Sequence, residues 1–327
     1  MKILQKAPER DFIILNLTDP QLNDDEWNPE HRNRKILEYT ITELIYRVRP
    51  DLITVSGDLA WAGCDYSYDM FAEFLNGFGI PWAPVWGNHD NQNGAEYING
   101  VAERYMKYSH CLYEKGDPTL GNGNYIISVE EDGKPIEAIF MLDSHDKDLY
   151  CDENGNPVQV WSKLTQAQGE WISAQSAELR ARGCADGTIV CHIPIYGYRK
   201  ASAAAYKSTV LHEKLTPDTA VGDECWNERY ADSVGVQHED VSSYPEDDGM
   251  LETIRATDLV HQIVVGHNHV NNWIIRYDGI CMAYALKCGA GSYWEQNLNG
   301  GTVFRIDSTG VSSVYHEYVD VDMVIND

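Results

Sequence analysis

Short apolar runs alternate with amphipathic segments through the first third of the chain. The runs at 12–17, 52–55 and 83–86 are almost continuously apolar, which is typical of strands buried on both faces. Between them, apolar residues recur at helical spacing over 36–48 and about 69–75. This order predicts an α/β fold in which parallel strands are joined by right-handed helical crossovers.

The rest of the chain gives further helix and strand signals. Asn28-Pro29 is a typical N-cap and first-turn pair, so we expect the first long helix to begin there. An acidic turn joins the strand-like runs 124–129 and 136–142 into a hairpin, and Thr165 with Gln168 forms a capping box for a helix ending near 182. The sequence also predicts a strand over 187–193, a helix over about 250–261 and a strand over 263–265. Short antiparallel strands should follow to about 319.

Composition limits the possible partners and location. The 327 residues include 51 acidic and 25 basic side chains, a net charge of −26, which disfavours nucleic acid polymers and anionic membranes as partners. The eight cysteines form no CxxC pair and are expected to be free thiols. The N-terminus lacks an apolar leader and no stretch reaches transmembrane length, so we expect a cytoplasmic protein.

Five predicted strand ends place metal-ligand residue types where a parallel sheet brings its loops together. The residues are Asp19, Gln21, Asp58, Asn88, His192, His267 and His269. Carboxylate, amide and imidazole groups together suit Mn, Fe or Zn. Seven candidates exceed one tetrahedral site, so they indicate two divalent ions.

These residues lie in segments that resemble the five ordered motifs of the calcineurin-like metallophosphoesterase superfamily. The segments are Asp19-Pro20-Gln21, Gly57-Asp58, Gly87-Asn88-His89-Asp90, His192 and Gly266-His267-Asn268-His269. The resemblance implies a four-layer sandwich of two mixed β-sheets flanked by helices, in one domain over 10–320. By position it implies one metal held by Asp19, Gln21, Asp58 and His269. It implies a second held by Asp58, Asn88, His192 and His267, with Asp58 as the bridge and His89 as the catalytic residue.

Two positions depart from the family pattern. Gln21 stands where a histidine is common, and its carbonyl oxygen is a weaker ligand for soft metals, so metal preference is expected to change. Trp61 stands three residues after Asp58, where purple acid phosphatases have a tyrosine and the serine/threonine phosphatases an aspartate. On this ground we expect the chain to lie outside both branches.

The expected function is a dinuclear metal-dependent phosphoesterase that hydrolyses a small phosphomonoester or phosphodiester by in-line attack of a metal-bridging hydroxide. The alternative is an inactive scaffold that binds a protein partner through an irregular insertion at about 196–248; a nuclease is disfavoured by the net charge. Within the insertion, Tyr196, Tyr198 and Arg199 follow His192 closely and are expected to face the substrate. Substrate identity does not follow from the sequence.

Overall fold

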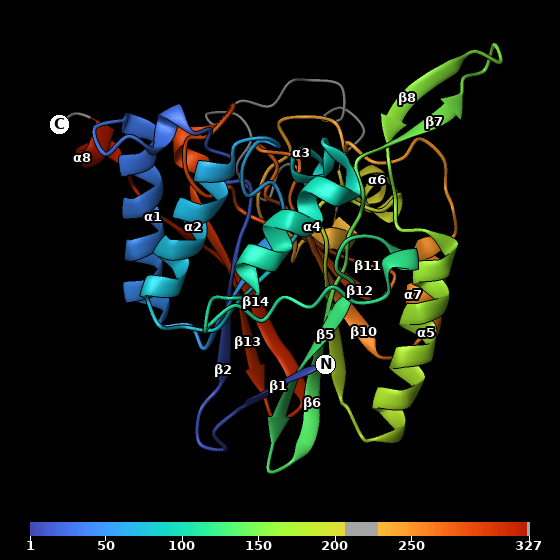
Figure 1. Cartoon of the computed structure of the whole chain (residues 1–327). Helices are drawn as coiled ribbons and strands as arrows, with labels where there is room; N and C mark the ends of the chain where they lie inside the picture. The colour runs from blue at the N-terminus through green and yellow to red at the C-terminus, as the bar shows by residue number, and fades with distance from the viewer. Residues whose placement is uncertain (207–227, 326–327) are drawn as a thin grey trace.

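The computed structural model describes residues 1–206 and 228–325, and two β-sheets form its centre (Figure 1). The larger sheet has seven strands in the order β1 (Lys2–Gln5), β5 (Tyr125–Glu131), β6 (Lys134–Met141), β9 (Asp186–Val190), β10 (Val260–Val265), β12 (Ile280–Tyr284) and β11 (Ile274–Tyr277). The smaller sheet has the order β14 (Gly310–Tyr318), β13 (Gly300–Asp307), β2 (Phe12–Leu17), β3 (Leu52–Ser56) and β4 (Trp82–Val85). Both sheets mix parallel and antiparallel pairs, as predicted.

Helices cover the outer faces of the two sheets, which completes the four layers (Figure 1). On one side lie α1 (Arg32–Val48), α2 (Asp65–Gly77) and α4 (Gly94–Tyr105); α5 (Gln166–Ala181) and α7 (Met250–Ala256) lie on the other. Strand β14 contacts β6 and β9, so the two sheets face one another. The shorter helices and turns are η1 (Asp25–Trp27), α3 (Asn88–Asn91), η2 (Pro118–Leu120), α6 (Gly197–Ala205), η3 (Glu228–Tyr230), η4 (Gln296–Leu298) and α8 (Asp322–Ile325).

The start of α1 differs from the prediction. The helix begins at Arg32, and the His31 side chain is its N-cap, accepting a hydrogen bond from the backbone N–H of Asn33. Asn28 instead accepts from the N–H of Glu30 at 2.9 Å, so Asn28-Pro29 forms the preceding turn. By contrast, the capping box of Thr165 and Gln168 is present at the start of α5, as predicted.

Several elements were not predicted, among them β1, α6 and the strands β7 (Lys147–Cys151) and β8 (Pro157–Trp161). Strand β1 is short and mostly exposed, and it pairs with β5. Helix α6 lies within the insertion that was expected to be irregular; part of that insertion, 207–227, lies outside the described residues. Strands β7 and β8 form a two-stranded hairpin that projects beyond the body of the molecule (Figure 1).

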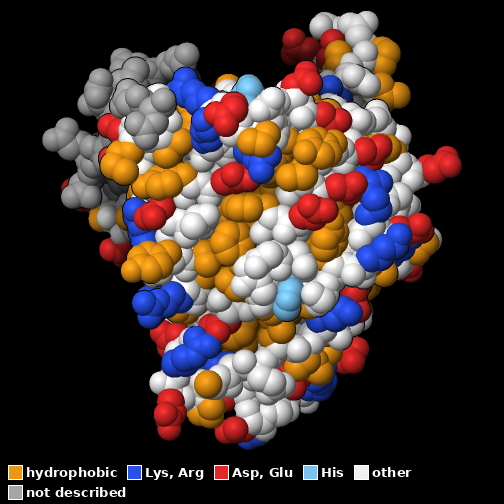
Figure 2. Space-filling model, turned by 60° about the vertical axis from the view of Figure 1, so that its left-hand side comes forward, with side chains coloured by type: hydrophobic (Ala, Val, Ile, Leu, Met, Phe, Trp, Pro, Cys, Tyr) orange, Lys and Arg blue, Asp and Glu red, His pale blue; other side chains and the backbone are white. Residues whose placement is uncertain are grey.

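Charged and apolar side chains are mixed on the face of the molecule shown in Figure 2. Figure 2 shows acidic, basic and hydrophobic side chains interspersed over one face, with no continuous basic area on that face. Among the described residues, no helix combines the length and apolar character needed to span a bilayer. The seven cysteines in the described part of the chain are all free thiols, and three of them are at least partly exposed: Cys64, Cys111 and Cys151.

Candidate metal centre

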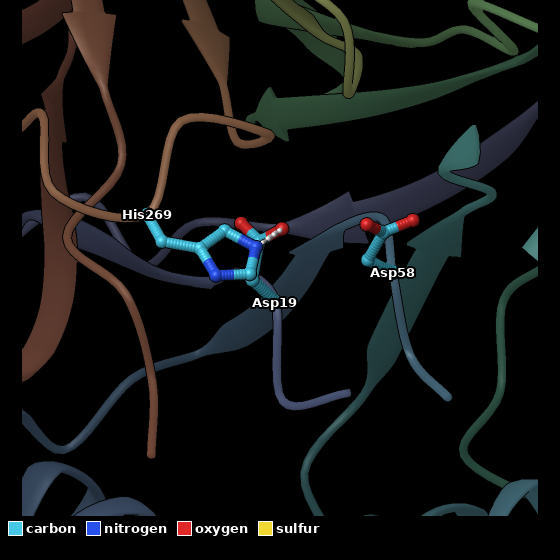
Figure 3. A group of neighbouring side chains, drawn as sticks. All are labelled: Asp19, Asp58 and His269. Atoms are coloured by element: carbon cyan, nitrogen blue, oxygen red, sulfur yellow. Dashed lines mark ion pairs between the residues drawn. The ribbon is translucent and has the colours of Figure 1, made fainter. Parts of the chain in front are cut away.

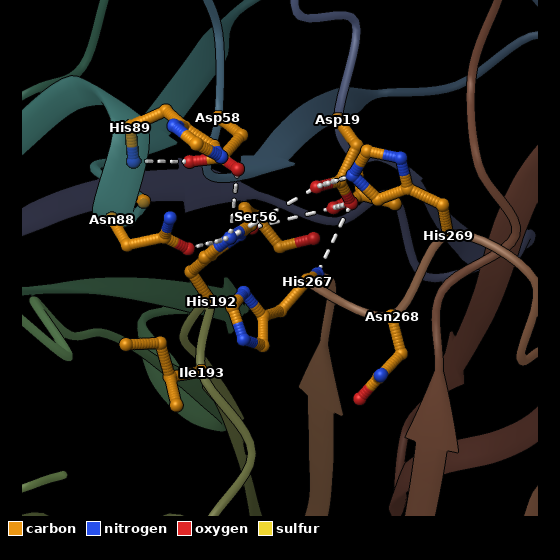
Figure 4. A network of polar contacts seen from close by, with 12 residues as sticks. Asp19, Ser56, Asp58, Asn88, His89, His192, Ile193, His267, Asn268 and His269 are labelled. Atoms are coloured by element: carbon orange, nitrogen blue, oxygen red, sulfur yellow. Dashed lines mark hydrogen bonds and ion pairs between the residues drawn. The ribbon is translucent and has the colours of Figure 1, made fainter. Parts of the chain in front are cut away.

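The fold brings the five predicted strand ends to one place. Asp19 follows β2, Asp58 follows β3, Asn88 begins α3 directly after β4, His192 follows β9, and the segment 267–269 follows β10. Figure 4 shows these side chains converging between the ends of the two sheets. We call the seven predicted ligands, Asp19, Gln21, Asp58, Asn88, His192, His267 and His269, the candidate centre.

The backbone of the candidate centre is unusual. Four of its residues have positive φ without being glycine: Asp19 (55°), Gln21 (44°), Asp58 (50°) and His267 (74°). Such conformations are costly for side-chain-bearing residues and cluster at functional sites. Hydrogen bonds between neighbouring loops hold them, because the N–H of Asp19 donates to the carbonyl of Gly57 and that of Gln21 to the carbonyl of Asp58, both at 3.1 Å.

Two carboxylates and one imidazole form one group within this centre. One ligand atom from each of Asp19, Asp58 and His269 lies within 4.8 Å of the others (Figure 3). His269 Nε2 is 3.2 Å from Asp19 Oδ1. This group places Asp19 and Asp58 within reach of a common ion, as the predicted first site requires.

The predicted second site is centred on His192. Its Nε2 atom lies 3.2 Å from Asp58 Oδ2 and 3.1 Å from Asn88 Oδ1. The rings of His192 and His267 have centroids 5.2 Å apart. The carboxylate of Asp58 therefore belongs to both groups, since it lies near Asp19 and His269 and also contacts His192 (Figure 4).

Unpaired donor atoms test whether these residues fit a metal. Both amide atoms of Gln21 and the Nε2 atom of His267 are buried without a hydrogen-bond partner. Buried polar atoms are nearly always paired in folded proteins, so unpaired ones indicate a missing ion or ligand. Oxygen and imidazole nitrogen are suitable donors for borderline divalent ions. The residues present fit a divalent metal centre.

Neighbouring backbone carbonyls orient two of the imidazoles. His192 Nδ1 donates to the carbonyl of Ser56, and His269 Nδ1 donates to that of Tyr293, each at 2.8 Å. In both rings this leaves Nε2 facing the carboxylates. Metal-binding histidines are commonly held in this way by a partner on the other ring nitrogen.

The charges of the candidate centre shift the pKa values of its members in opposite directions. Burial alone would raise the pKa of Asp19 and Asp58, but the neighbouring imidazoles outweigh it and lower both. Burial opposes the charging of His192, yet the carboxylates of Asp58 and Asp19 raise its pKa to about 9. Burial and the charge on His192 lower the pKa of His267 to about 3. His267 is therefore neutral at pH 7, as a metal ligand must be.

Asp90 fixes the turn that presents Asn88 and His89. Its carboxylate accepts hydrogen bonds from the N–H of Gly87 at 2.7 Å, from the N–H of Leu59 at 3.1 Å and from the hydroxyl of Tyr68 at 2.7 Å. Burial and the charge of Asp58 raise its pKa to about 7. Asp90 thus ties α3 to the loop after β3.

His89 lies beside the candidate centre, and its side chain contacts residues outside the set of predicted ligands. Its backbone N–H donates to Asp58 Oδ1 at 2.9 Å, while its imidazole is partly exposed. The ring packs against Trp61 and its Nδ1 contacts the amide of Gln92. The imidazole is thus close to the centre and open to a substrate.

The three residues predicted to contact the substrate lie in different environments. Tyr198 was expected to face the substrate, but its side chain is fully buried under α6 and its hydroxyl donates to the carbonyls of Ile263 and Ala283. It is a core residue, and the prediction for it is wrong. Arg199 is engaged with Ser243 Oγ at 2.8 Å, and Tyr196 is partly exposed; their roles stay predictions.

Sequence reasoning missed Lys287, which lies against the candidate centre. Its ammonium is buried, follows β12 and donates to the backbone carbonyl of Asp19. Burial lowers its pKa, against the opposing effect of Asp19. The available signal was a single lysine inside the otherwise apolar and small-residue run 280–290.

Asn268, between His267 and His269, anchors the insertion to this centre. Its Oδ1 accepts from the N–H of Ser242 and from the hydroxyl of Tyr284, and its Nδ2 donates to the carbonyl of Asp240. The end of the insertion is therefore attached directly to the loop that holds two predicted ligands.

This fold and arrangement define the class of protein. The family model for calcineurin-like phosphoesterases matches residues 13–271, so the chain belongs to that family. A solved structure described as a dimetal phosphatase from Danio rerio has the same fold, with a TM-score of 0.56 at 14% identity, covering 94% of this chain and 98% of that one.

Two sequence relatives have phosphatase names, and one of them is named as inactive. The chain is 26% identical over 271 residues to a "Probable inactive purple acid phosphatase 14" of Arabidopsis thaliana, which covers 76% of this chain and 60% of the relative. It is 27% identical over 163 residues to the "Phosphatase DCR2" of Saccharomyces cerevisiae, covering 43% and 28%. The chain thus spans less than two thirds of the length of these relatives. One relative has the purple acid phosphatase name, so the exclusion of that branch on the basis of Trp61 stays a prediction.

Proposed function

We propose that this chain is a metal-dependent phosphoesterase that hydrolyses small phosphate esters at a dinuclear centre. The observation that supports this most directly is the set of buried, unpaired donor atoms of Gln21 and His267 beside Asp19, Asp58 and His192. When bound, two divalent ions such as Mn, Fe or Zn supply a hydroxide near neutral pH and stabilise the charge that gathers on the phosphoryl oxygens.

The side chains of the protein have separate roles in this proposal. Asp58 joins the two halves of the centre, and the carbonyl partners of His192 and His269 orient their rings. His89 donates a hydrogen bond or a proton to the oxygen of the leaving group, a contribution of about 10²- to 10⁴-fold for general acids. We propose one domain over 10–320, in which the insertion forms part of the rim of the site through Asn268.

The experiment that tests this function is a substrate and metal panel. The purified chain is assayed against phosphomonoesters and phosphodiesters with Mn, Fe, Zn and no added metal, and bound metal is counted by elemental analysis. We expect metal-dependent hydrolysis of at least one ester and two ions per chain. Metal binding without hydrolysis of any ester would favour the inactive scaffold, which the name of the Arabidopsis relative makes the second candidate.

The variant His89→Asn separates these two candidates further. It should leave folding and metal content unchanged, because the ring contacts no predicted ligand. Its loss of rate should be larger for alkyl phosphates, whose alkoxide needs a proton, than for 4-nitrophenyl phosphate, whose phenolate leaves unaided. Equal losses for both substrates would show that His89 stabilises phosphoryl charge instead.

A further inference from the structure

The segment 58–62 contacts His89 at three points. The carboxylate of Asp58 accepts from the backbone N–H of His89 at 2.9 Å, and the carbonyl of His89 accepts from the N–H of Ala62 at 3.1 Å. Between them, the indole of Trp61 packs on the imidazole, with ring centroids 4.3 Å apart and planes inclined at 56°. The backbone of His89 is thus fixed on both sides, and one face of its ring is covered.

Gln92 supplies a fourth contact to His89. It is the C-cap of α3, and its Nε2 atom lies 2.8 Å from His89 Nδ1. One ring nitrogen is therefore occupied by an amide, and only Nε2 remains for a substrate. The histidine side chain has two rotatable bonds, and this ring is partly exposed. Its orientation therefore depends on the contacts with Trp61 and Gln92.

We propose that Trp61 and Gln92 are positioning residues that hold the His89 imidazole with Nε2 directed at the leaving group. The inference rests on the proposed function, because it assigns a role toward the same reaction. Trp61 stands where purple acid phosphatases have a tyrosine and the serine/threonine phosphatases an aspartate, and its indole contributes packing in place of ligation or charge. A catalytic group that is misplaced by about 1 Å can lose on the order of 10²-fold in rate, so positioning alone has a measurable effect.

The competing interpretation is that Trp61 only fills space beside α3. Both interpretations predict lower activity for Trp61→Leu, so the leaving group decides between them. Only the positioning role predicts that the loss depends on the need for a proton. Only the positioning role predicts that Trp61→Leu causes no loss of activity once His89 is absent.

The experiment measures kcat and KM of three variants, Trp61→Leu, Trp61→Phe and Gln92→Leu, in the presence of Mn²⁺. The substrates are 4-nitrophenyl phosphate and glycerol 2-phosphate. If the wild type prefers diesters, the matching diesters are used. For Trp61→Leu and Gln92→Leu we expect kcat on the alkyl ester to fall by about 10- to 100-fold. On the nitrophenyl ester kcat should change less than about threefold, and KM should be unchanged for both esters. Trp61→Phe should restore most of the rate, because a smaller aromatic ring can still cover the imidazole.

Two controls accompany these variants. Trp161→Leu removes an indole that packs on His267 at 4.5 Å, so its effect should be the same for both esters. In a double-mutant cycle, Trp61→Leu added to His89→Asn should cause no further loss. Thermal unfolding of each variant shows whether it is folded, and the imidazole ¹⁵N shifts of His89 report the Gln92 contact without reference to activity.

The outcomes distinguish failure of the positioning role from failure of the proposed phosphoesterase function. Equal losses on both esters, or a further loss in the His89→Asn background, would overturn the positioning role while leaving the phosphoesterase intact. Unchanged His89 ¹⁵N shifts in Gln92→Leu would overturn the role of Gln92 in particular. If the wild type hydrolyses no ester with any metal, the proposed function fails, and the positioning role fails with it.

Discussion

The substitution Gly87→Ala tests the closest packing in the candidate centre. Gly87 precedes Asn88, and a Cβ atom placed on it would lie 2.2 Å from Asp58 Oδ1 and 2.4 Å from the backbone nitrogen of Asp58. Real Cβ contacts are not shorter than about 3.0 Å, so the turn and Asp58 have to separate. The backbone nitrogen cannot rotate away as a flexible side chain would.

We expect Gly87→Ala to have two measurable effects. Overpacking a buried site costs about 1–3 kcal/mol of unfolding free energy. Because the shift moves the proposed bridging ligand relative to Asn88 and His89, metal occupancy should fall and kcat should drop by about 10²-fold. Denaturant unfolding gives the stability, elemental analysis after dialysis gives the metal content, and hydrolysis with Mn²⁺ gives the rate.

Gly100→Ala is the matched control for the same chemical change. Gly100 is exposed in the middle of α4, its φ is not positive, and a Cβ there would meet nothing within 4 Å. Alanine in a helix interior is more favourable than glycine by about 0.5–1 kcal/mol, so this variant should be slightly more stable and equally active. If Gly87→Ala instead matches the wild type in stability, metal content and rate, the close approach of the turn to Asp58 is not a feature of the molecule.

Three further predictions concern single residues in or next to the candidate centre. Asp58→Asn should lose metal and activity together, because it removes a charge facing both sites; two-metal loading in this variant would exclude the bridging role. Gln21→His should keep activity and shift preference toward metals that favour imidazole, whereas unchanged metal selectivity would place Gln21 outside the coordination sphere. Asn268→Ala leaves the N–H of Ser242 and the hydroxyl of Tyr284 without their acceptor, so unfolding free energy should fall by about 1–3 kcal/mol, measured by denaturant titration. Unchanged stability in Asn268→Ala would mean that the insertion is held by other contacts.

The sequence sufficed to place the strands that end at the centre, because continuous apolar runs followed by a polar residue, with an intervening glycine after β3, β4 and β10, leave little freedom. The two facing sheets and their helical cover were implied by the resemblance to the metallophosphoesterase superfamily. The pattern of strand ends led us to expect Asp19, Asp58 and His192 to lie together, and they do. The hairpin of β7 and β8 was not predictable in the same way. Its strands are largely exposed, with Leu149 at 76% and Val158 at 37%, so no buried face produced a regular alternation.

Tyr198 and Lys287 show why proximity along the chain is a poor guide to the substrate side of a site. Tyr198 lies six residues after His192, but α6 begins at Gly197 and turns its ring into the core. Lys287 is 268 residues from Asp19 in sequence, yet its ammonium reaches the carbonyl of Asp19. Both outcomes depend on how a helix or a loop packs on the sheet, and a local pattern does not contain that information.

The opposite pKa shifts of His192 and His267 predict how many protons metal uptake releases. His192 has its pKa raised to about 9, so the metal-free protein holds a proton there at pH 8. His267 has its pKa lowered to about 3 and has no proton to lose. An imidazole must be neutral to bind a metal, so uptake at pH 8 should release about one proton from His192, beyond the proton that a metal-bound water loses. Metal affinity should accordingly rise with pH up to about 9.

Calorimetric titration of Mn²⁺ or Zn²⁺ at pH 8, in buffers of different ionisation enthalpy, counts this proton. The choice of pH 8 keeps Asp90, whose pKa is about 7, mostly ionised and out of the count. In His192→Asn the release should be smaller than in the wild type by about one proton. The same shift has a consequence without metal: since the folded pKa is above the unfolded value of about 6.5, the stabilisation from charged His192 is fully present below pH 6.5 and is lost as the pH rises through 9. A heat of binding independent of the buffer at pH 8 would show that His192 is already neutral, and the carboxylates of Asp58 and Asp19 would then not hold its proton.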